Sequence, residues 1–219
     1  MYLKEVVYTD VQIYDHNNFV NNLLNCHWKM IHKNIVNMLN VYALPKTILV
    51  FDLCEKGDLF DDIEKQSKYT EEDAAFCMMD ILSGLAYCHG KGVYHRDLKP
   101  DNLLITSIGH IKLTDFGLSK VGLMKRATEL YEDRQEEDAP IFGDLERVGT
   151  PDYFSPEVVL QQAYSIDVDW WAFGVVLYEF VHGITPFYAE AVEDVFSNII
   201  KGEVEFMEED VDEESEIID

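Results

Sequence analysis

Residues 94–104, YHRDLKPDNLL, constrain the fold more than any other stretch of this sequence. They place a basic pair, an acid, a lysine and an asparagine close together and then turn apolar. A solvated loop has no need of the apolar residues, and a core strand excludes the charges. We therefore interpret the stretch as a loop held beside an apolar layer, because loops on a rigid scaffold are where catalytic side chains usually lie.

The residues around this loop predict a strand-rich front and a helical remainder. Alternation and β-branched residues indicate strands, whereas apolar residues at helical spacing between cap signals indicate helices. Thr70 with Asp73 is one such N-terminal signal. A hinge is expected at residues 52–57. The predicted strands are 1–14, 34–44, 46–53, 102–106 and 110–116, and the predicted helices are 17–31, 58–66, 70–92 and 170–181. Strands 34–44 and 46–53 are expected to form a hairpin at Pro45-Lys46, and strands 102–106 and 110–116 to lie on either side of a turn at Ile108-Gly109.

The charge balance argues against some partners. The 219-residue chain has 42 acidic and 17 basic side chains and a formal charge of −25, so nucleic acid is not expected as a partner. Residues 207–219 are acidic and are predicted to be a disordered tail, which either solubilises the chain or docks on a partner. The longest apolar run is too short to insert across a membrane. Widely spaced cysteines without a Cys-x-x-Cys pair favour a reducing, intracellular location, cytoplasmic or also nuclear.

Three motifs recur in a fixed order along the chain. His95-Arg96-Asp97-Leu98 is followed by Asn102 and, thirteen residues later, by Asp115-Phe116-Gly117, and GTPDYFSPE comes at 149–157. This order and spacing resemble those of protein kinases across residues 32–206. The resemblance implies an α+β, bilobal fold with a truncated β-rich N-lobe at 1–53 and a mainly helical C-lobe at 54–206 that lacks its last helices.

The resemblance also implies the catalytic roles, which suit the chemistry of phosphoryl transfer. That reaction depends on positioning and on electrostatic stabilisation of the phosphate oxygens. Asp97 is expected to accept the proton of the substrate hydroxyl, and Lys99 to place positive charge beside the phosphate. Asn102 and Asp115 are expected to supply oxygen ligands to Mg²⁺. The sequence HRDLKPDN resembles Ser/Thr kinases rather than tyrosine kinases.

The resemblance further predicts a site for ATP. Phe51 is expected to be the gatekeeper, and His95 and Phe116 resemble members of the regulatory spine, although ordinary core packing describes them equally well. The residues expected to contact the nucleotide are Lys4, Asp52, Cys54, Asp58 and Leu104.

The substrate is expected to be a protein with a Ser or Thr in a basic context. Asp58, Asp101 and Glu179 stand where basophilic kinases of the AGC group keep substrate-facing acids, and the alternative is that each is a surface carboxylate. The segment between Asp115 and Glu157 is similar to that of the microtubule-associated Ser/Thr kinases and Greatwall.

We also make predictions about three further carboxylates that affect stability or regulation. Asp169 is expected to be stabilised by its own helix dipole and by the helix's unpaired amides. Glu146 either mimics a phosphate by pairing with Arg96 or is a free surface glutamate. Glu157 is expected to be buried and to lack the arginine that pairs with it in the family, which costs stability.

Other parts of the kinase pattern are missing from this sequence. The first glycine is Gly57, so no glycine-rich loop precedes the hinge. The family's helix glutamate is expected near position 23, where residues 21–24 (Asn, Asn, Leu, Leu) include no acid. We read the chain as incomplete at both ends, by a partial gene model or by degeneration. Two hypotheses follow: a Ser/Thr kinase with weak or no activity as this chain, or a pseudokinase that serves as an interaction scaffold.

Overall fold

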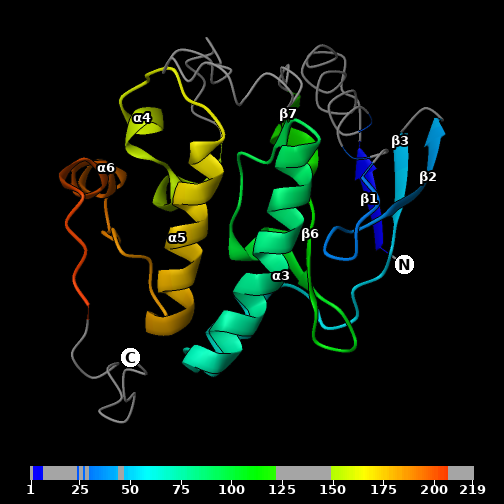
Figure 1. Cartoon of the computed structure of the whole chain (residues 1–219), viewed down its shortest axis with the longest axis horizontal. Helices are drawn as coiled ribbons and strands as arrows, with labels where there is room; N and C mark the ends of the chain where they lie inside the picture. Colours follow the sequence, from blue (N-terminus) through cyan, green and yellow to red (C-terminus); the bar gives the residue numbers. More distant parts are fainter. Residues whose placement is uncertain are drawn as a thin grey trace, which may run out of the picture.

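The computed structural model describes residues 2–6, 24, 27, 30–43, 47–121 and 149–206. A small sheet forms one side of the molecule, and helices form the other (Figure 1). The mixture of a strand-rich beginning and a mainly helical remainder confirms the predicted α+β fold class.

Three antiparallel strands form the first sheet, in the order β1 (Tyr2–Val6), β3 (Thr47–Phe51), β2 (Met38–Ala43). The pairing of β2 with β3 confirms the predicted hairpin. The expected strand 34–44 nevertheless begins only at Met38. The preceding residues pair with another segment, because Val36 N–H donates to Leu113 O and Leu113 N–H donates to Asn34 O, both at 2.9 Å.

Two of the predicted elements lie mostly outside the described residues. Of the strand expected at 1–14, the structure describes residues 2–6, which form β1. Of the helix expected at 17–31, Leu24 and His27 are helical, Met30 and Ile31 are not, and the remainder lies outside the described residues.

The helices α2 (Leu59–Gln66) and α3 (Glu71–Gly90) confirm two predictions. Helix α3 begins at the expected cap, since Thr70 accepts a hydrogen bond from Asp73 N–H, and α2 begins at a cap that was not predicted, Asp58, which accepts one from Asp61 N–H. Helix α3 is buried along one side, where Gly84 allows close packing. A Cβ at this glycine would lie 2.6 Å from the Leu113 Cδ1 atom and 2.9 Å from Asn34 O.

Short strands and turns surround the loop that bears the charged motif. Strand β4 (Val93–Tyr94) pairs with β7 (Lys120–Val121), and β5 (Leu103–Ile105) pairs with β6 (Ile111–Leu113). The second hairpin confirms the predicted turn, but its strands are shorter than expected. Strand β6 ends before Asp115, because that residue adopts left-handed backbone angles (φ 61°, ψ 65°) and caps the 3₁₀ turn Phe116–Leu118.

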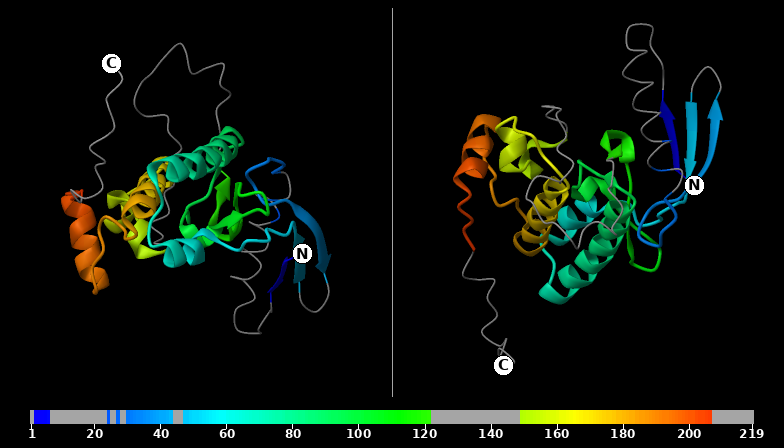
Figure 2. Two further views of the ribbon diagram at one scale, coloured as in Figure 1. Left: turned by 90° about the horizontal axis from the view of Figure 1, so that it is seen from below. Right: turned by 45° about the horizontal axis from the view of Figure 1, so that its top comes forward.

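Three helices complete the second half of the molecule: α4 (Pro156–Val159), α5 (Asp167–His182) and α6 (Val192–Lys201). Helix α5 runs beside α3, and α6 lies on the side of α5 away from the sheet (Figures 1 and 2). The main core packs between α3, α5 and the β5–β6 hairpin, and it includes Phe180, which is completely buried. No helix among the described residues is long and apolar enough to cross a membrane.

Candidate active site

The loop between β4 and the 3₁₀ turn Pro100–Asn102 is held in place by a buried carboxylate of α5. Asp169 accepts hydrogen bonds from His95 N–H at 2.9 Å, from Arg96 N–H at 2.7 Å and from His89 Nε2 at 2.8 Å. Arg96 has a positive φ of 65°, which is strained for a residue with a side chain. The two bonds to consecutive amides hold the backbone in this conformation.

These contacts correct the expected role of Asp169. Its partners are backbone amides of the loop and His89, rather than the amides of its own helix. Burial raises the pKa of this carboxyl, but the His89 hydrogen bond, the neighbouring histidines and the Arg96 amide outweigh it, so the pKa lies below its ordinary value. Asp169 is therefore a buried anion that organises the loop.

Asp97, Lys99, Asn102 and Thr150 meet at the end of this loop. The Asn102 Nδ2 atom donates to Asp97 O at 2.7 Å and to Asp97 Oδ2 at 3.0 Å. Lys99 Nζ donates to Thr150 Oγ1 at 2.7 Å and lies 3.6 Å from Asp97 Oδ2. Because the amide nitrogen of Asn102 is committed to Asp97, its side-chain oxygen faces away from that carboxylate. The loop thus fixes a carboxylate, an ammonium and an amide oxygen in one place.

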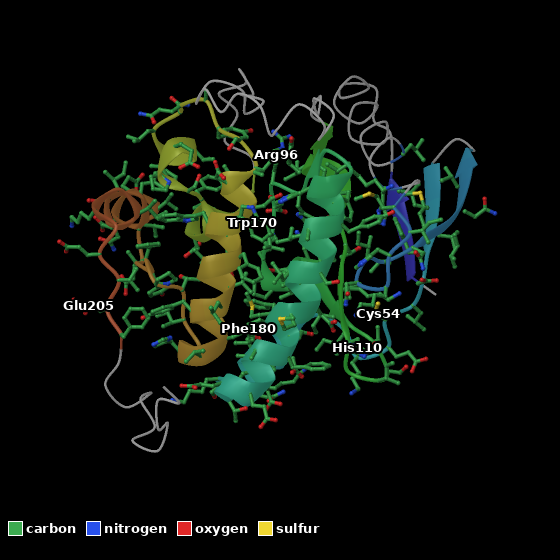
Figure 3. All side chains as sticks on the ribbon, viewed as in Figure 1. Cys54, Arg96, His110, Trp170, Phe180 and Glu205 are labelled. Carbon is green, nitrogen blue, oxygen red and sulfur yellow. The ribbon has the colours of Figure 1, made fainter. Side chains whose placement is uncertain are left out.

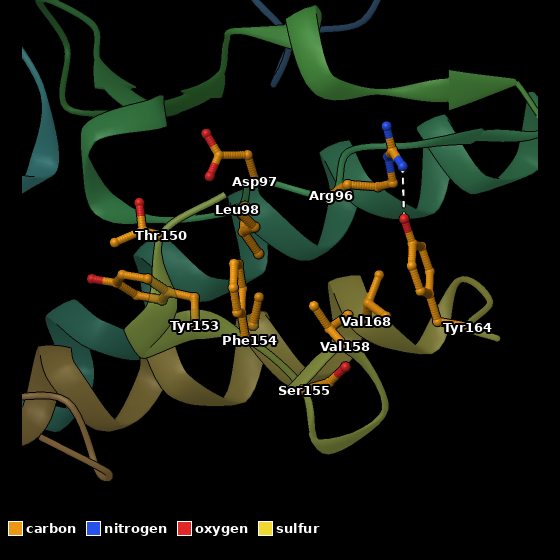
Figure 4. Close-up of a pocket in the computed structure, with 11 residues that line it drawn as sticks. Arg96, Asp97, Leu98, Thr150, Tyr153, Phe154, Ser155, Val158, Tyr164 and Val168 are labelled. Carbon is orange, nitrogen blue, oxygen red and sulfur yellow. Dashed lines mark hydrogen bonds between the residues drawn. The ribbon is translucent and has the colours of Figure 1, made fainter. Parts of the chain in front are cut away.

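Gly149 closes this arrangement from the other side. It has a φ of +114°, and a Cβ there would lie 3.0 Å from Asp97 Oδ1 and 3.2 Å from the Phe154 ring. Figure 4 shows Asp97 and Thr150 at one end of a small cavity of about 30 Å³, and Arg96 reaching Tyr164 at the other. The Arg96 guanidinium also donates to Leu118 O at 2.7 Å. The expected partner Glu146 lies outside the described residues.

We expect Gly149→Ala to destabilise the fold and to displace the Asp97 carboxylate. The φ of +114° is unfavourable for alanine, and the new Cβ would lie 3.0 Å from Asp97 Oδ1. The expected cost is about 1–3 kcal/mol of unfolding free energy, measured by urea denaturation. Gly90→Ala is the matched control, since a Cβ there meets nothing within 4 Å. Equal stability of the two variants would contradict the proposed role of Gly149.

Asp115 follows β6 and stands before the completely buried Phe116. Its carboxylate accepts a hydrogen bond from Gly117 N–H at 3.4 Å. Ser119 Oγ donates to His95 O at 3.2 Å, which attaches this segment to the loop that carries Asp97. The structure therefore ties the segments bearing Asp97 and Asp115 to each other.

A row of four aromatic rings links the loop to the first sheet. The ring centroids of His95 and Phe116 are 4.9 Å apart, those of Phe116 and His27 are 4.7 Å apart, and those of His27 and Phe51 are 5.3 Å apart. His27 also hydrogen-bonds Val36 O through Nε2. Only His95, Phe116 and Phe51 were predicted to matter, because the mixed pattern at 17–31 gave no reason to single out His27.

Three of the residues expected to contact a nucleotide, Asp52, Cys54 and Asp58, lie in the connection between β3 and α2. Leu104 packs against a cluster that includes Phe51 and the buried Cys54, and it bridges the backbone of Asp58. Asp52 N–H donates to Asn37 O at 3.0 Å, and the Asp52 carboxylate accepts from Asn37 Nδ2 at 2.6 Å. The Asp58 carboxylate caps α2 through Asp61 N–H at 2.9 Å.

Two further findings concern this group of residues. Lys4 lies in β1, where it pairs with Leu49 of β3. Burial raises the pKa of the Cys54 thiol, so this cysteine stays protonated at neutral pH.

Glu179 is buried rather than a surface carboxylate. Only 7% of it is exposed, and Tyr153 OH donates to its Oε2 at 2.6 Å. Burial, with the negative charges of Asp101 and Asp152 and despite the Tyr153 hydrogen bond, raises the pKa of Glu179 to about 7. Asp101 thus contributes to raising the pKa of Glu179, whereas Asp58 serves as a helix cap. Glu157, expected to be buried, is in fact only partly buried.

The raised pKa of Glu179 predicts a stability that depends on pH. Its native pKa of about 7 exceeds the ordinary 4.5, so the unfolded chain loses the proton first as pH rises. Stability is therefore expected to fall between pH 4.5 and 7 by up to about 3 kcal/mol from this group, and to level off above. Urea denaturation at pH 5 and pH 8 measures the change. Glu179→Gln should remove this component, and Glu190→Gln, at an exposed position, should leave it.

The fold and the loop geometry together define a protein kinase domain, and the comparisons agree. The chain matches the protein kinase domain family over residues 3–218. It is 39% identical over 172 residues to the probable serine/threonine protein kinase IREH1 of Arabidopsis thaliana, covering 71% of this chain and 13% of that protein. It is 35% identical over 170 residues to serine/threonine-protein kinase Sgk2 of Homo sapiens, covering 77% and 42%.

A third relative is calcium/calmodulin-dependent protein kinase type 1 of Macrobrachium nipponense, 38% identical over 179 residues, with 80% of this chain and 47% of that protein covered. The chain belongs to the protein kinase family, and its relatives are Ser/Thr kinases that include AGC members such as Sgk2 and Sgk3. It spans less than half the length of each relative described here.

Proposed function

We propose that this chain is the catalytic part of a protein Ser/Thr kinase that transfers the γ-phosphate of ATP to Ser or Thr hydroxyls. The observation that most directly supports this proposal is the position of Asp97. Its carboxylate accepts a hydrogen bond from Asn102, and its Oδ2 atom lies 3.6 Å from Lys99 Nζ. A base must be held in hydrogen-bonding reach of the hydroxyl it deprotonates. The Lys99 bond to Thr150 holds the ammonium beside this base.

The same residues suit ATP with Mg²⁺. Bound magnesium supplies positive charge to the phosphate oxygens. Asn102 and Asp115 offer one amide oxygen and one carboxylate, which are the hard donors that this ion prefers. Among the described residues no group of three His, Cys, Asp or Glu side chains gathers for a metal. We propose that the remaining ligands come from phosphate and water, that Lys4 contacts the phosphates, and that Asp52, Cys54, Asp58 and Leu104 hold the nucleoside.

A basic substrate is part of the proposal, because carboxylates gather around Tyr153. Burial is the main reason that the pKa of Glu179 is raised to about 7, and the negative charges of Asp101 and Asp152 add to it. A lysine or arginine of the substrate would relieve this repulsion. Within the kinase family, we propose that the chain is most similar to the microtubule-associated Ser/Thr kinases and Greatwall. We also propose that it is intracellular, in the cytoplasm or also in the nucleus.

A scaffold without phosphoryl transfer is the second candidate. It is favoured by the sequence before Gly57, which has no glycine, and by residues 21–24, which include no acid near the position of the family's helix glutamate. A glycine-rich loop covers the phosphates in kinases. We therefore propose weak or no activity for this chain by itself, because positioning of the nucleotide is impaired.

Turnover on basic Ser/Thr peptides tests the proposed activity. We expect a rate below the range of about 1–100 per second that is typical of kinases. Asp97→Asn should lower that residual rate by about 100-fold or more, because it removes the base. Asp167→Asn, an exposed carboxylate on α5, is the control and should leave the rate unchanged. A measurable rate that is the same for Asp97→Asn and the unaltered chain would refute the catalytic role.

A further inference from the structure

Arg96 is held at three points, and one of them is a tyrosine that has no part in the proposed reaction. Its backbone N–H donates to Asp169, its Nε donates to Leu118 O at 2.7 Å, and its Nη1 donates to Tyr164 OH at 2.7 Å. In the view of Figure 3, Arg96 lies between the upper ends of α5 and α3. Tyr164 lies in the connection between α4 and α5. The arginine beside the proposed base therefore depends on a residue that is 68 positions away in the sequence.

The hydroxyl of Tyr164 has a different role from its ring. Tyr164 is 5% exposed, and its ring belongs to an apolar cluster that includes Val158 and Val168. Figure 4 shows the ring beside these two valines, with the hydroxyl directed at Arg96. Phenylalanine would fill the same space in this cluster. The hydroxyl of a buried tyrosine usually finds a hydrogen-bond partner, and hydrogen bonds to a charged group such as this guanidinium are the stronger kind.

Through Arg96, this hydroxyl acts on the two carboxylates of the proposed reaction. Asp97 follows Arg96 directly, and Leu118 comes three residues after Asp115. The Arg96 side chain therefore joins the loop that carries the base to the segment that carries the proposed magnesium ligand. A long side chain with one hydrogen bond keeps much of its rotational freedom. Two bonds from one planar guanidinium, at Nε and at Nη1, fix its orientation.

The backbone of Arg96 also needs support from its surroundings. Its φ of 65° is a strained conformation, which persists only where neighbouring groups hold it. The Asp169 carboxylate holds the backbone N–H, and Tyr164 holds the far end of the side chain. Loss of the hydroxyl is therefore expected to loosen Arg96 and Asp97 while the apolar cluster stays filled.

We propose that Tyr164 is a positioning residue of this kinase domain, which acts through Arg96 to fix the Asp97 loop relative to the Asp115 segment. Displacing a catalytic group by about 1 Å can cost roughly 100-fold in rate, so such a contact matters although it is remote from the substrate. The effect on turnover rests on the proposed function. The effect on the loop does not, because the hydrogen bonds are made within the folded chain itself.

Tyr164→Phe in the full chain tests the proposal, because it removes only the hydroxyl. We expect the amides of Arg96, Asp97 and Ser119 to exchange with solvent about tenfold faster, measured by NMR, and those of α3 to keep their rates. Tyr188→Phe, at a position that is 57% exposed, is the matched control and should change neither group. Unchanged exchange at Arg96 and Asp97 in the Tyr164 variant would overturn the proposal. So would an equal acceleration in α3, because it would indicate a loss of global stability.

A double-mutant cycle with Arg96→Met identifies the route by which Tyr164 acts. Methionine keeps a long apolar stem but has no guanidinium, so the hydroxyl loses its partner. In this background, Tyr164→Phe should cause no further acceleration of exchange at Asp97. A further acceleration of the same size as in the unaltered chain would show that Tyr164 acts without Arg96, and would contradict the proposal.

Turnover on a basic Ser/Thr peptide gives a second readout. We expect Tyr164→Phe to lower kcat by about tenfold and to leave the KM for the peptide unchanged, since the position of the base changes and the peptide contacts do not. A raised KM with unchanged kcat would assign the hydroxyl to peptide binding and overturn the proposal. A chain without measurable turnover would count against the proposed function alone, because hydrogen exchange still decides the role of Tyr164.

Discussion

Asp169→Asn is expected to lower the unfolding free energy by about 3–5 kcal/mol, the range typical of breaking a buried charged contact. The carboxylate is 1% exposed and accepts three hydrogen bonds, from two loop amides and from His89. An asparagine keeps one acceptor oxygen and turns an NH₂ group toward a donor. One N–H then loses its acceptor, and the strained backbone of Arg96 loses part of its support.

Asp167→Asn is the matched control for this experiment. It lies on the same first turn of α5, so it removes the same charge from the helix N-terminus, but the residue is exposed. We expect a change of about 0.5 kcal/mol at most. Urea denaturation of both variants gives the comparison. A similar loss in the two would mean that the helix dipole stabilises Asp169, as the sequence suggested, and that the loop amides do not.

Local signals in the sequence predicted much of the fold. The Thr70 cap and the apolar spacing that follows fixed α3 within two residues of its observed end. The β5–β6 hairpin was predicted from its turn, but the end of β6 was not, because the left-handed conformation of Asp115 depends on tertiary packing. Likewise, residues 34–36 were predicted to be part of the strand that pairs with β3. They do form backbone hydrogen bonds, but with Leu113 instead.

Some features of the candidate site could likewise be predicted from the sequence, and others could not. The types and order of the polar residues in 95–102 were readable, because the motif spacing is specific. The burial of Glu179 was not, since a carboxylate in a helix reads as a surface residue, and its burial comes from Tyr153 on another segment. The sequence also did not predict that His27 packs between Phe51 and Phe116. Contacts between segments that are distant in sequence decided both cases.

The magnesium dependence of ATP binding distinguishes a kinase from a scaffold. Asp115→Ala is expected to abolish this dependence. We expect calorimetry to show that the unaltered chain binds ATP at least tenfold more tightly with Mg²⁺ than without. Asp115 is the carboxylate that is proposed to contact the ion, and carboxylate oxygens are the ligands that Mg²⁺ prefers. Asp115→Ala should bind ATP equally with and without the ion.

The control for this experiment is Asp152→Ala, which removes a carboxylate near Tyr153 and Glu179 instead of the proposed metal ligand. It should keep the magnesium dependence. Since Asp115 caps the turn at Phe116, thermal unfolding of each variant establishes that the fold persists. ATP binding that is independent of magnesium in the unaltered chain would favour the scaffold, because the nucleotide would then be held without the ion that phosphoryl transfer requires. A dependence that survives in Asp115→Ala would place the ion on other ligands.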